Sequence, residues 1–314
     1  MSLTRLQRGV ALITALLVMA IATTLAVTMS VRQNDAILRT ATLQLRDQGR
    51  ELALGGVAFA RMVLEQDDRT VDGPADSWAQ TLPPMPIDGG TIRGRIIDMQ
   101  GRFNLNNLVN NDGTVNPIAY ARFARLLANL NLNPAILDEV VDWIDPDRDV
   151  SPRGAEDEAY TGLNPPYRTA NRPMVSVSEL RQIRSVDEAA YRALAPLVAA
   201  LPSGTTINLN SASQEIIDAL SDHPVPRREV DHDADPLPQN FGSIEEALSY
   251  HGLTPTDIDT EGLSVNSQYF LIEVEVLLGA TSYHLYTLVY RPSNGPTQVI
   301  TRTFEPCLNA ISCI

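Results

Sequence analysis

The chain contains no lysine, since all 24 of its basic residues are arginine, and these are outnumbered by 38 acidic residues. The absence of lysine excludes Schiff-base catalysis and lysine nucleophiles. The formal net charge of -14 argues against a nucleic-acid partner, because binding phosphates requires a contiguous excess of basic side chains. We therefore expect an acidic protein that does not bind nucleic acid.

Histidine and cysteine are also scarce. The four histidines form no HExxH motif, no GxSxG motif occurs, and no nucleophile has a recognisable base beside it, so we expect no enzyme. The two cysteines, Cys307 and Cys313, lie close together at the C-terminal end of the sequence. They form either a small disulfide loop in an oxidising compartment or a pair of free thiols.

Proline is absent before Pro74, and the 22 residues from Val10 to Val31 carry no charge. At ~1.5 Å per residue, a helix of that length covers roughly 33 Å, enough to cross a hydrocarbon core of about 30 Å. Apolar residues recur at helical spacing beyond this run, which predicts one helix from Val10 to about Glu65. Glycines at 49, 55 and 56 should weaken it.

Two other interpretations of the apolar run are a simple signal anchor and a secretory signal peptide that ends near Ala22. The run is longer than most signal-peptide cores, which favours a permanent membrane helix. Arginines flank it on both sides, so the charge distribution does not decide its orientation.

Composition and periodicity then divide the rest of the chain. Residues 71–90 read as a loop rich in Pro, Gly and Asp, in which Trp78 packs back. Alternating patterns predict strands at 91–99, 102–105, 270–276, 282–291 and 298–304, with turns at Gln100-Gly101 and Gly279-Ala280. Between them, the pattern from 106 to 262 is helical. We therefore predict an α+β fold with a large all-α domain inserted into a small antiparallel sheet.

Helix signals punctuate the inserted region. Asn116-Pro117 and Asn133-Pro134 each place a cap residue before a proline, Ser185 and Ser243 open two further helices, and Gly252 closes the last. Residues 103–106 (Phe-Asn-Leu-Asn) resemble residues 207–210 (Ile-Asn-Leu-Asn), and each segment precedes a serine-led helix, at Ser178 or Ser243. This weak repeat suggests two related units.

The densest chemistry lies in residues 142–157, where carboxylates alternate at Asp145, Asp147 and Asp149 and Glu156 is the twelfth residue counted from Asp145. This spacing is that of a calcium loop, because a hard dication takes six to eight oxygen ligands and relieves the repulsion among crowded acids. We predict calcium bound by some of Asp145, Asp147, Asp149, Glu156 and Asp157, with a backbone carbonyl or Asn171.

The match to a calcium loop is imperfect. Val150 occupies the position where such loops need glycine, and Pro152 is foreign to them, so an irregular site rather than an EF-hand is expected. A solvated acidic turn is the competing interpretation. A second candidate, Asp231-His232-Asp233-Ala234-Asp235 with His223 nearby, lies among prolines and is better explained as an exposed loop.

Several segments resemble one protein family, the minor pseudopilin K of the bacterial type II secretion system (general secretion pathway protein K). They are the Arg8-Gly9 junction before Val10, Trp143-Ile144-Asp145, residues 154–157, Pro165-Pro166-Tyr167 and residues 176–180. The central segments are specific, whereas the N-terminal one is common to type IV pilin-like proteins. The resemblance covers essentially the whole chain.

The resemblance implies a type IV pilin-like fold and a processed N-terminus. A prepilin peptidase would cut between Gly9 and Val10, and the new N-terminus at Val10 would be methylated. The protein would be a single-pass inner-membrane protein whose C-terminal domain is periplasmic. The expected organisation is a leader (1–9), a helix (10–66, membrane-spanning over 10–31), a linker with first strands (67–105), the α-helical insert (106–262), C-terminal strands (263–305) and a tail (306–314).

Related pilins carry glutamate at the fifth mature position, where this chain has Thr14. A carboxylate in the bilayer costs at least ~2.5 kcal/mol unless paired, in pilins with the N-terminal amine of the subunit ahead. A subunit that has no other subunit ahead of it lacks that partner. The bulky insert would also obstruct the helical stacking of subunits. The hypothesis is a tip-capping protein that helps to start pseudopilus assembly, with other minor pseudopilins, the prepilin peptidase and secreted exoproteins as its partners.

Two alternatives come from other functional classes. Residues 207–213 resemble the opening of a helix-hairpin-helix unit, which would make the protein a membrane-anchored DNA receptor, although its charge is wrong for DNA. A calcium-dependent periplasmic hydrolase is the other alternative, and it lacks a catalytic constellation.

Overall fold

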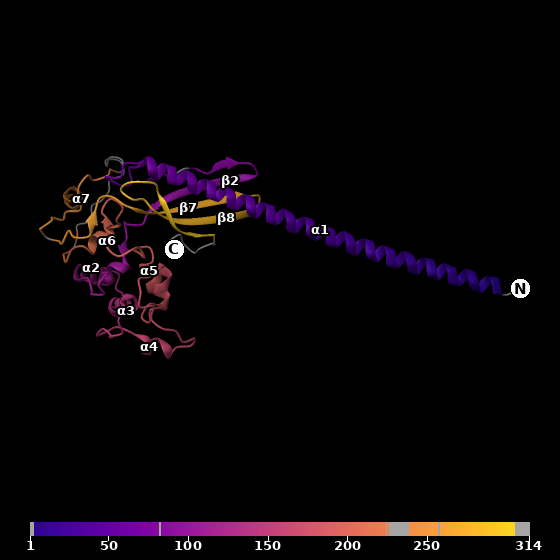
Figure 1. Ribbon diagram of the computed structural model, residues 1–314, viewed down its shortest axis with the longest axis horizontal. Coiled ribbons are helices and arrows are strands. Elements are labelled where there is room, and N and C mark those ends of the chain that lie inside the picture. The colour runs from indigo at the N-terminus through magenta and orange to yellow at the C-terminus, as the bar shows by residue number, and fades with distance from the viewer. Residues whose placement is uncertain (1–2, 82, 224, 226–238, 257, 305–314) are drawn as a thin grey trace. The chain divides into compact units, whose positions relative to one another are not determined.

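A computed structural model describes residues 3–81, 83–223, 225, 239–256 and 258–304, and for residues 3–9 it describes the backbone only. The chain divides into two compact units, residues 1–51 and 52–314. Helix α1 (Leu3–Gln66) is continuous, which confirms the single long helix expected from the sequence (Figure 1). From Val10 it is long and apolar enough to cross a membrane.

The second unit contains a five-stranded antiparallel sheet in the order β1-β2-β7-β8-β9. The strands are β1 (Met85–Ile87), β2 (Gly90–Asp98), β7 (Tyr269–Leu278), β8 (Thr281–Tyr290) and β9 (Gln298–Thr303). The hairpin turn predicted at Gly279-Ala280 is confirmed, and Gly279 has a φ of 58°. Strands β2 and β7 are neighbours although 170 residues lie between Asp98 and Tyr269.

One face of the sheet packs against the C-terminal part of α1. Phe270, Ile272, Val274 and Val276 form a core with α1 residues such as Ala53, Val57 and Leu64, and Trp78 closes it with an edge-on contact to Phe270. The opposite face carries the cross-strand pairs Arg93–Glu275 and Arg95–Glu273. The alternation of apolar and charged residues predicted for these strands is therefore confirmed.

Gly56 allows the helix to approach the sheet closely. A Cβ atom at this position would lie 2.9 Å from a Val274 methyl group, whereas at Gly55 it would meet nothing within 4 Å. The two adjacent glycines thus have different structural roles, and α1 runs through both without interruption.

The inserted region between β2 and β7 contains short helices joined by loops (Figure 1), and it has its own apolar core. Its helices are η2 (Leu105–Leu108), α2 (Pro117–Asn129), α3 (Ala135–Ile144), α4 (Asp157–Thr161), η3 (Val177–Gln182), α5 (Glu188–Leu194), α6 (Gln214–Asp218) and α7 (Ile244–Tyr250). The short 3₁₀ helix η1 (Ser77–Ala79) precedes the sheet.

The predicted pairing of residues 102–105 with strand β2 is wrong. Strand β3 (Phe103–Asn104) instead pairs in parallel with β4 (Val198–Ala199), and β5 (Ile207–Asn208) pairs in parallel with β6 (Leu263–Ser264). The physical reason is that β2 already has β1 on one edge and β7 on the other. The Phe103 amide therefore donates to the Leu197 carbonyl.

The two similar Phe/Ile-Asn-Leu-Asn segments make the same kind of contacts. The Asn106 carboxamide accepts from the Met174 amide and donates to the carbonyls of Met174 and Leu201. The Asn210 carboxamide accepts from the Phe241 amide and donates to the carbonyls of Phe241 and Val265. Each asparagine thus clamps the segment that enters the serine-capped helix of its own half, which supports the two-unit interpretation.

Some of the predicted helix caps are confirmed, and two others lie two residues from their predicted positions. Asn116 caps α2, Ser243 caps α7, and Gly252 follows α7 with a φ of 72°. The cap of η3 is Ser176 in a capping box with Glu179 rather than Ser178, and α5 is capped by Asp187 rather than Ser185. Asn133 accepts a hydrogen bond from the Ala135 amide at the start of α3.

Candidate functional site

The acidic loop starts from one face of α3. Asp138, Asp142 and Asp145 are spaced four and three residues apart, which places them on the same side of the helix. Asp138 accepts from Tyr120 and Arg153, and both oxygens of Asp142 lie 3.2 Å from the Ser151 amide. These contacts bring the loop back over the end of the helix.

The close approach of the loop to the end of α3 requires glycine at position 154. A Cβ atom there would lie 1.9 Å from an Asp142 carboxylate oxygen, so any side chain would collide with that group. The backbone of residues 151–154 is therefore held directly against Asp142, and the loop closes without the glycine that an EF-hand has at its sixth position.

Two carboxylates of the loop are buried and incompletely hydrogen-bonded. Asp145 is 6% exposed and Glu156 is 4% exposed. Asp145 Oδ1 and Glu156 Oε1 have no hydrogen-bond partner among the described residues, while Glu156 Oε2 accepts from Thr169 at 2.9 Å. A buried charged oxygen without a partner is costly, and a cation would remove that cost.

The pKa values of these groups reflect the same crowding. Burial raises the pKa of Asp145 to about 7, assisted by the charges of Asp147, Asp142, Glu156 and Asp149. Burial also raises the pKa of Glu156, partly offset by its hydrogen bond from Thr169. Ionisation is therefore less favourable for both carboxylates than for solvated ones.

The other predicted ligands are arranged less favourably. Asp147 and Asp149 are exposed, and Asp147 Oδ1 accepts from the Asp149 amide at 2.8 Å. Asp157 Oδ1 accepts from both the amide and the hydroxyl of Thr169. Asn171, with a φ of 44°, donates to the Asp147 carbonyl. The fold thus brings all six predicted residues to one region but buries only two.

The donor set fits calcium chemically. It consists of oxygen atoms, without thiolate or imidazole, as hard dications prefer. Asp142 was not among the predicted ligands, although its position on the helix face that also presents Asp145 was a usable signal. No three carboxylates of this loop in the described part have ligand atoms within 4.8 Å of one another. Binding would therefore require the loop to contract.

Three carboxylates do meet this distance elsewhere, at Asp67, Asp72 and Asp76. Asp72 pairs through both of its oxygens with Arg291, which is itself buried and also contacts Asp67. Burial raises the pKa of Asp72 to about 6 despite this arginine. Because Arg291 already pairs with two of these three carboxylates, we assign the group a structural role at the end of α1.

The helix-hairpin-helix resemblance has a structural explanation. Asn208 donates to the Asp72 carbonyl, to Asp98 and to Ser267, and Asn210 forms the clamp described above. The polar side chains of this segment are therefore used inside the fold.

Thr14 satisfies its own hydroxyl within α1. Its Oγ1 atom lies 3.0 Å from the carbonyl oxygens of Val10 and Ala11, to which it donates. The Thr14 hydroxyl therefore needs no partner from another chain. A carboxylate at the same position in a membrane helix would need one.

Several predicted residues lie outside the described part of the chain. They are Cys307, Cys313 and the segment Asp231–Asp235. The side chain of Arg8, next to the predicted cleavage site, is also outside it. His223 is described and exposed.

Comparison with known proteins places the chain in a family. A family model described as "Type II secretion system (T2SS), protein K" matches residues 101–203. The type II secretion system protein K of Pectobacterium carotovorum subsp. carotovorum is 32% identical over 95% of this chain and 96% of its own length. The chain belongs to the type II secretion system protein K family. The Pseudomonas aeruginosa protein K is 35% identical, covering 94% of this chain and 92% of that protein.

A solved structure shares the protein K fold. A chain of the GspK-GspI-GspJ complex from enterotoxigenic Escherichia coli matches with a TM-score of 0.75 and 24% identity, covering 86% of this chain and 100% of that chain. The match confirms the predicted α+β class with a long N-terminal helix and an antiparallel sheet. Membership of the protein K family supports a minor pseudopilin role, and the family's named relatives are secretion-system components.

Proposed function

We propose that the protein is the minor pseudopilin that caps the tip of a periplasmic type II secretion pseudopilus and helps to start its assembly. The observation that carries the proposal is Thr14, whose hydroxyl is satisfied by its own helix at 3.0 Å. A subunit with a carboxylate at this depth gains from a partner ahead of it, whereas this one does not need that partner.

The inserted region supports the same position. A large region with several short helices is inserted between two neighbouring strands of the sheet, β2 and β7. A mass of this size beside the pilin-like sheet would obstruct a further subunit stacked in the same way. At the end of a filament it meets no such obstacle.

Processing and location follow from the same proposal. A prepilin peptidase cuts between Gly9 and Val10 on the cytoplasmic side, Val10 is methylated, and residues 10–31 stay in the inner membrane with the C-terminal domain in the periplasm. The apolar, uncharged composition of α1 from Val10 to Val31 supports the membrane assignment. Mass spectrometry of the native N-terminus tests it, and a retained Met1 would contradict it.

We further propose that its partners are other minor pseudopilins, in keeping with the GspK-GspI-GspJ complex formed by its structural relative. The test is co-purification of the full-length protein with the minor pseudopilins of its own system, with each candidate tagged in turn. A stable hetero-complex is expected. Co-purification with duplex DNA in a salt-dependent manner, and with no pseudopilin, would instead support the DNA-receptor alternative.

Calcium is proposed as the ion of the acidic loop. Asp145 and Glu156 would provide the buried ligands, and Asp147, Asp149, Asp157, Asn171 and backbone carbonyls are candidates for the rest. The ion would supply the positive charge that the two unpartnered carboxylate oxygens lack. Addition of a chelator to the purified protein should lower its melting temperature, and an unchanged melt would refute the site.

A further inference from the structure

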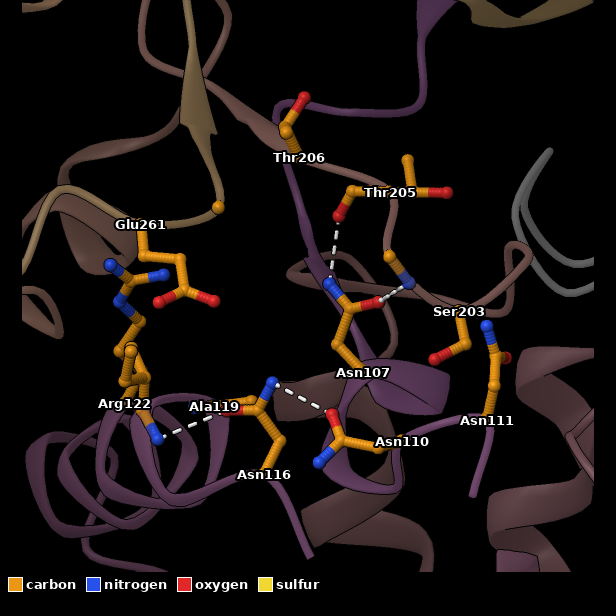
Figure 2. A pocket seen from close by; sticks show the side chains of 13 residues that line it. Asn107, Asn110, Asn111, Asn116, Ala119, Arg122, Ser203, Thr205, Thr206 and Glu261 are labelled. Atoms are coloured by element: carbon orange, nitrogen blue, oxygen red, sulfur yellow. Dashed lines mark hydrogen bonds between the residues drawn. The ribbon is translucent and has the colours of Figure 1, made fainter. Parts of the chain in front are cut away.

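A polar cleft of about 310 Å³ lies between the two halves of the inserted region. Figure 2 shows Arg122 and Glu261 on one wall, with Asn107, Asn110 and Asn111 across from them. Among the described residues that line the cleft, none is aromatic, and Ile118 and Ala119 are the only ones with hydrocarbon side chains. Most of the other lining side chains carry hydrogen-bonding groups.

Three of the four carboxamides that line the cleft are held in place by the fold. Asn107 donates to the Thr205 carbonyl and accepts from the Gly204 amide, and Asn116 donates to Asn110 while capping α2 (Figure 2). Fixed side chains of this kind lose little rotational freedom when a ligand binds, which favours binding.

These side chains keep unused hydrogen-bonding capacity of both kinds. A carboxamide nitrogen has two hydrogens, and Asn107, Asn110 and Asn116 each use one in a hydrogen bond between described residues. Ser203 and Thr205 donate their hydroxyl hydrogens to backbone carbonyls and so remain able to accept. The cleft therefore offers both donors and acceptors.

The charged residues of the cleft oppose each other in sign. Arg122 is 6% exposed, donates to the Asp259 carbonyl, and forms no ion pair with any residue in the described ranges. Burial lowers the pKa of its guanidinium, with the Asp259 charge acting in the opposite direction. Glu261 lines the same cleft, so the walls carry one positive and one negative group. The two charges cancel in sum, so the cleft has no net charge that would favour a ligand of either sign.

We propose that this cleft binds a neutral, hydroxyl-rich ligand the size of one sugar ring. Each hydroxyl group of such a ligand both donates and accepts, which matches walls that offer both. The volume lies at the lower end of the range of ligand pockets, about 300–1,000 Å³. A peptide main chain also donates and accepts, so a dipeptide is included in the test as the competing ligand. The absence of an aromatic platform predicts weak binding, on the order of millimolar.

The test is saturation-transfer NMR of N-acetylglucosamine and glucose with the full-length protein, in a detergent without a sugar head group. Binding to at least one sugar is expected. Asn111→Ala removes a side chain without a hydrogen bond to any other described residue, so it should leave folding intact and weaken binding about threefold to tenfold. Glu261→Gln removes the acceptor charge and should weaken it at least as much.

Asn294→Ala is the matched control, because Asn294 is an exposed asparagine in the loop between β8 and β9 and does not line the cleft. It should leave binding unchanged. The proposal is overturned by no detectable sugar binding up to about 50 mM, by binding that both cleft variants leave unaltered, or by tighter binding of glycylglycine than of either sugar.

Discussion

Asp145 combines burial, an oxygen without a partner and a raised pKa in one side chain. In the absence of calcium its negative charge is unfavourable, so Asp145→Asn should increase the free energy of unfolding at pH 8 by at least about 1 kcal/mol. In calcium the same variant should lose the stabilisation that the ion provides. Chemical denaturation with and without a chelator measures both effects.

Asp88→Asn is the appropriate control for that experiment, because Asp88 is exposed and is not among the predicted ligands. It should alter the calcium-free stability little. If Asp145→Asn behaved like this control in both conditions, the buried carboxylate would not be a calcium ligand.

The raised pKa values of Asp145 and Asp72 also predict how stability depends on pH. Their ordinary value is 3.8, and in the folded protein they titrate at about 7 and about 6. A raised folded pKa means that the folded state binds protons more tightly, so the stabilisation is complete below pH ~4 and is lost as pH rises through 6–7. Without calcium, the urea midpoint should be higher at pH 5.5 than at pH 8.

Calcium should reduce that pH dependence, since the ion takes the place of the proton at Asp145. Apparent calcium affinity should fall below pH 7 as protons compete for the same oxygen atoms. A urea midpoint that rises steadily from pH 5.5 to 8 without calcium would contradict the assignment.

The sequence was informative about the composition of this site and not about its arrangement. Alternating acids predicted Asp145 and Glu156 as ligands, and both are the buried members. The role of Gly154 could not be predicted, because it depends on how closely the loop returns to the helix. A Cβ atom at position 154 would lie 1.9 Å from an Asp142 carboxylate oxygen. Tertiary contacts of this kind leave no local pattern.

At the level of secondary-structure elements, the contact of α1 with the sheet depends on one of two adjacent glycines. Gly55→Ala should stabilise the protein by about 0.5–1 kcal/mol, because alanine favours a helix and meets nothing within 4 Å. Gly56→Ala gains the same propensity but places a methyl group 2.9 Å from Val274, so it should be less stable than Gly55→Ala by about 1–2 kcal/mol. Thermal denaturation of the pair, in one detergent, measures the difference. Equal melting temperatures would show that α1 does not pack closely at Gly56.

The two asparagine clamps provide a second test between elements. Asn106→Ala leaves one amide and two carbonyls without their partner, and each unsatisfied buried group costs about 1–3 kcal/mol. Asn210→Ala removes the equivalent three bonds but in a less buried position, so it should destabilise the protein less. Unfolding free energies that reversed this order would argue against equivalent clamps.

Helices and long strands could be predicted because their signals are local. The caps at Asn116 and Ser243 and the alternation in β7 are examples. The short parallel pairs β3–β4 and β5–β6 could not, because each strand has two residues and pairs with a segment more than 50 residues away. The expected hairpin from β2 into residues 102–105 failed because β7, from the far end of the insert, occupies that edge.

For the whole molecule, the family assignment and the proposed position in a filament rest on different observations. Membership of the type II secretion system protein K family follows from similarity along the full chain. The proposed tip position follows from Thr14 and from the insert between β2 and β7. Thr14→Glu should therefore leave the fold of the second unit unchanged, with an unaltered melting temperature, because residues 52–314 form a compact unit of their own.

The most direct test of the tip position is to locate the protein on assembled pseudopili. A tag placed in the exposed loop at Asn294 can be labelled with gold on filaments formed by the complete system and counted by electron microscopy. We expect one label at a single end of each filament. Labels distributed along the filament length would contradict it.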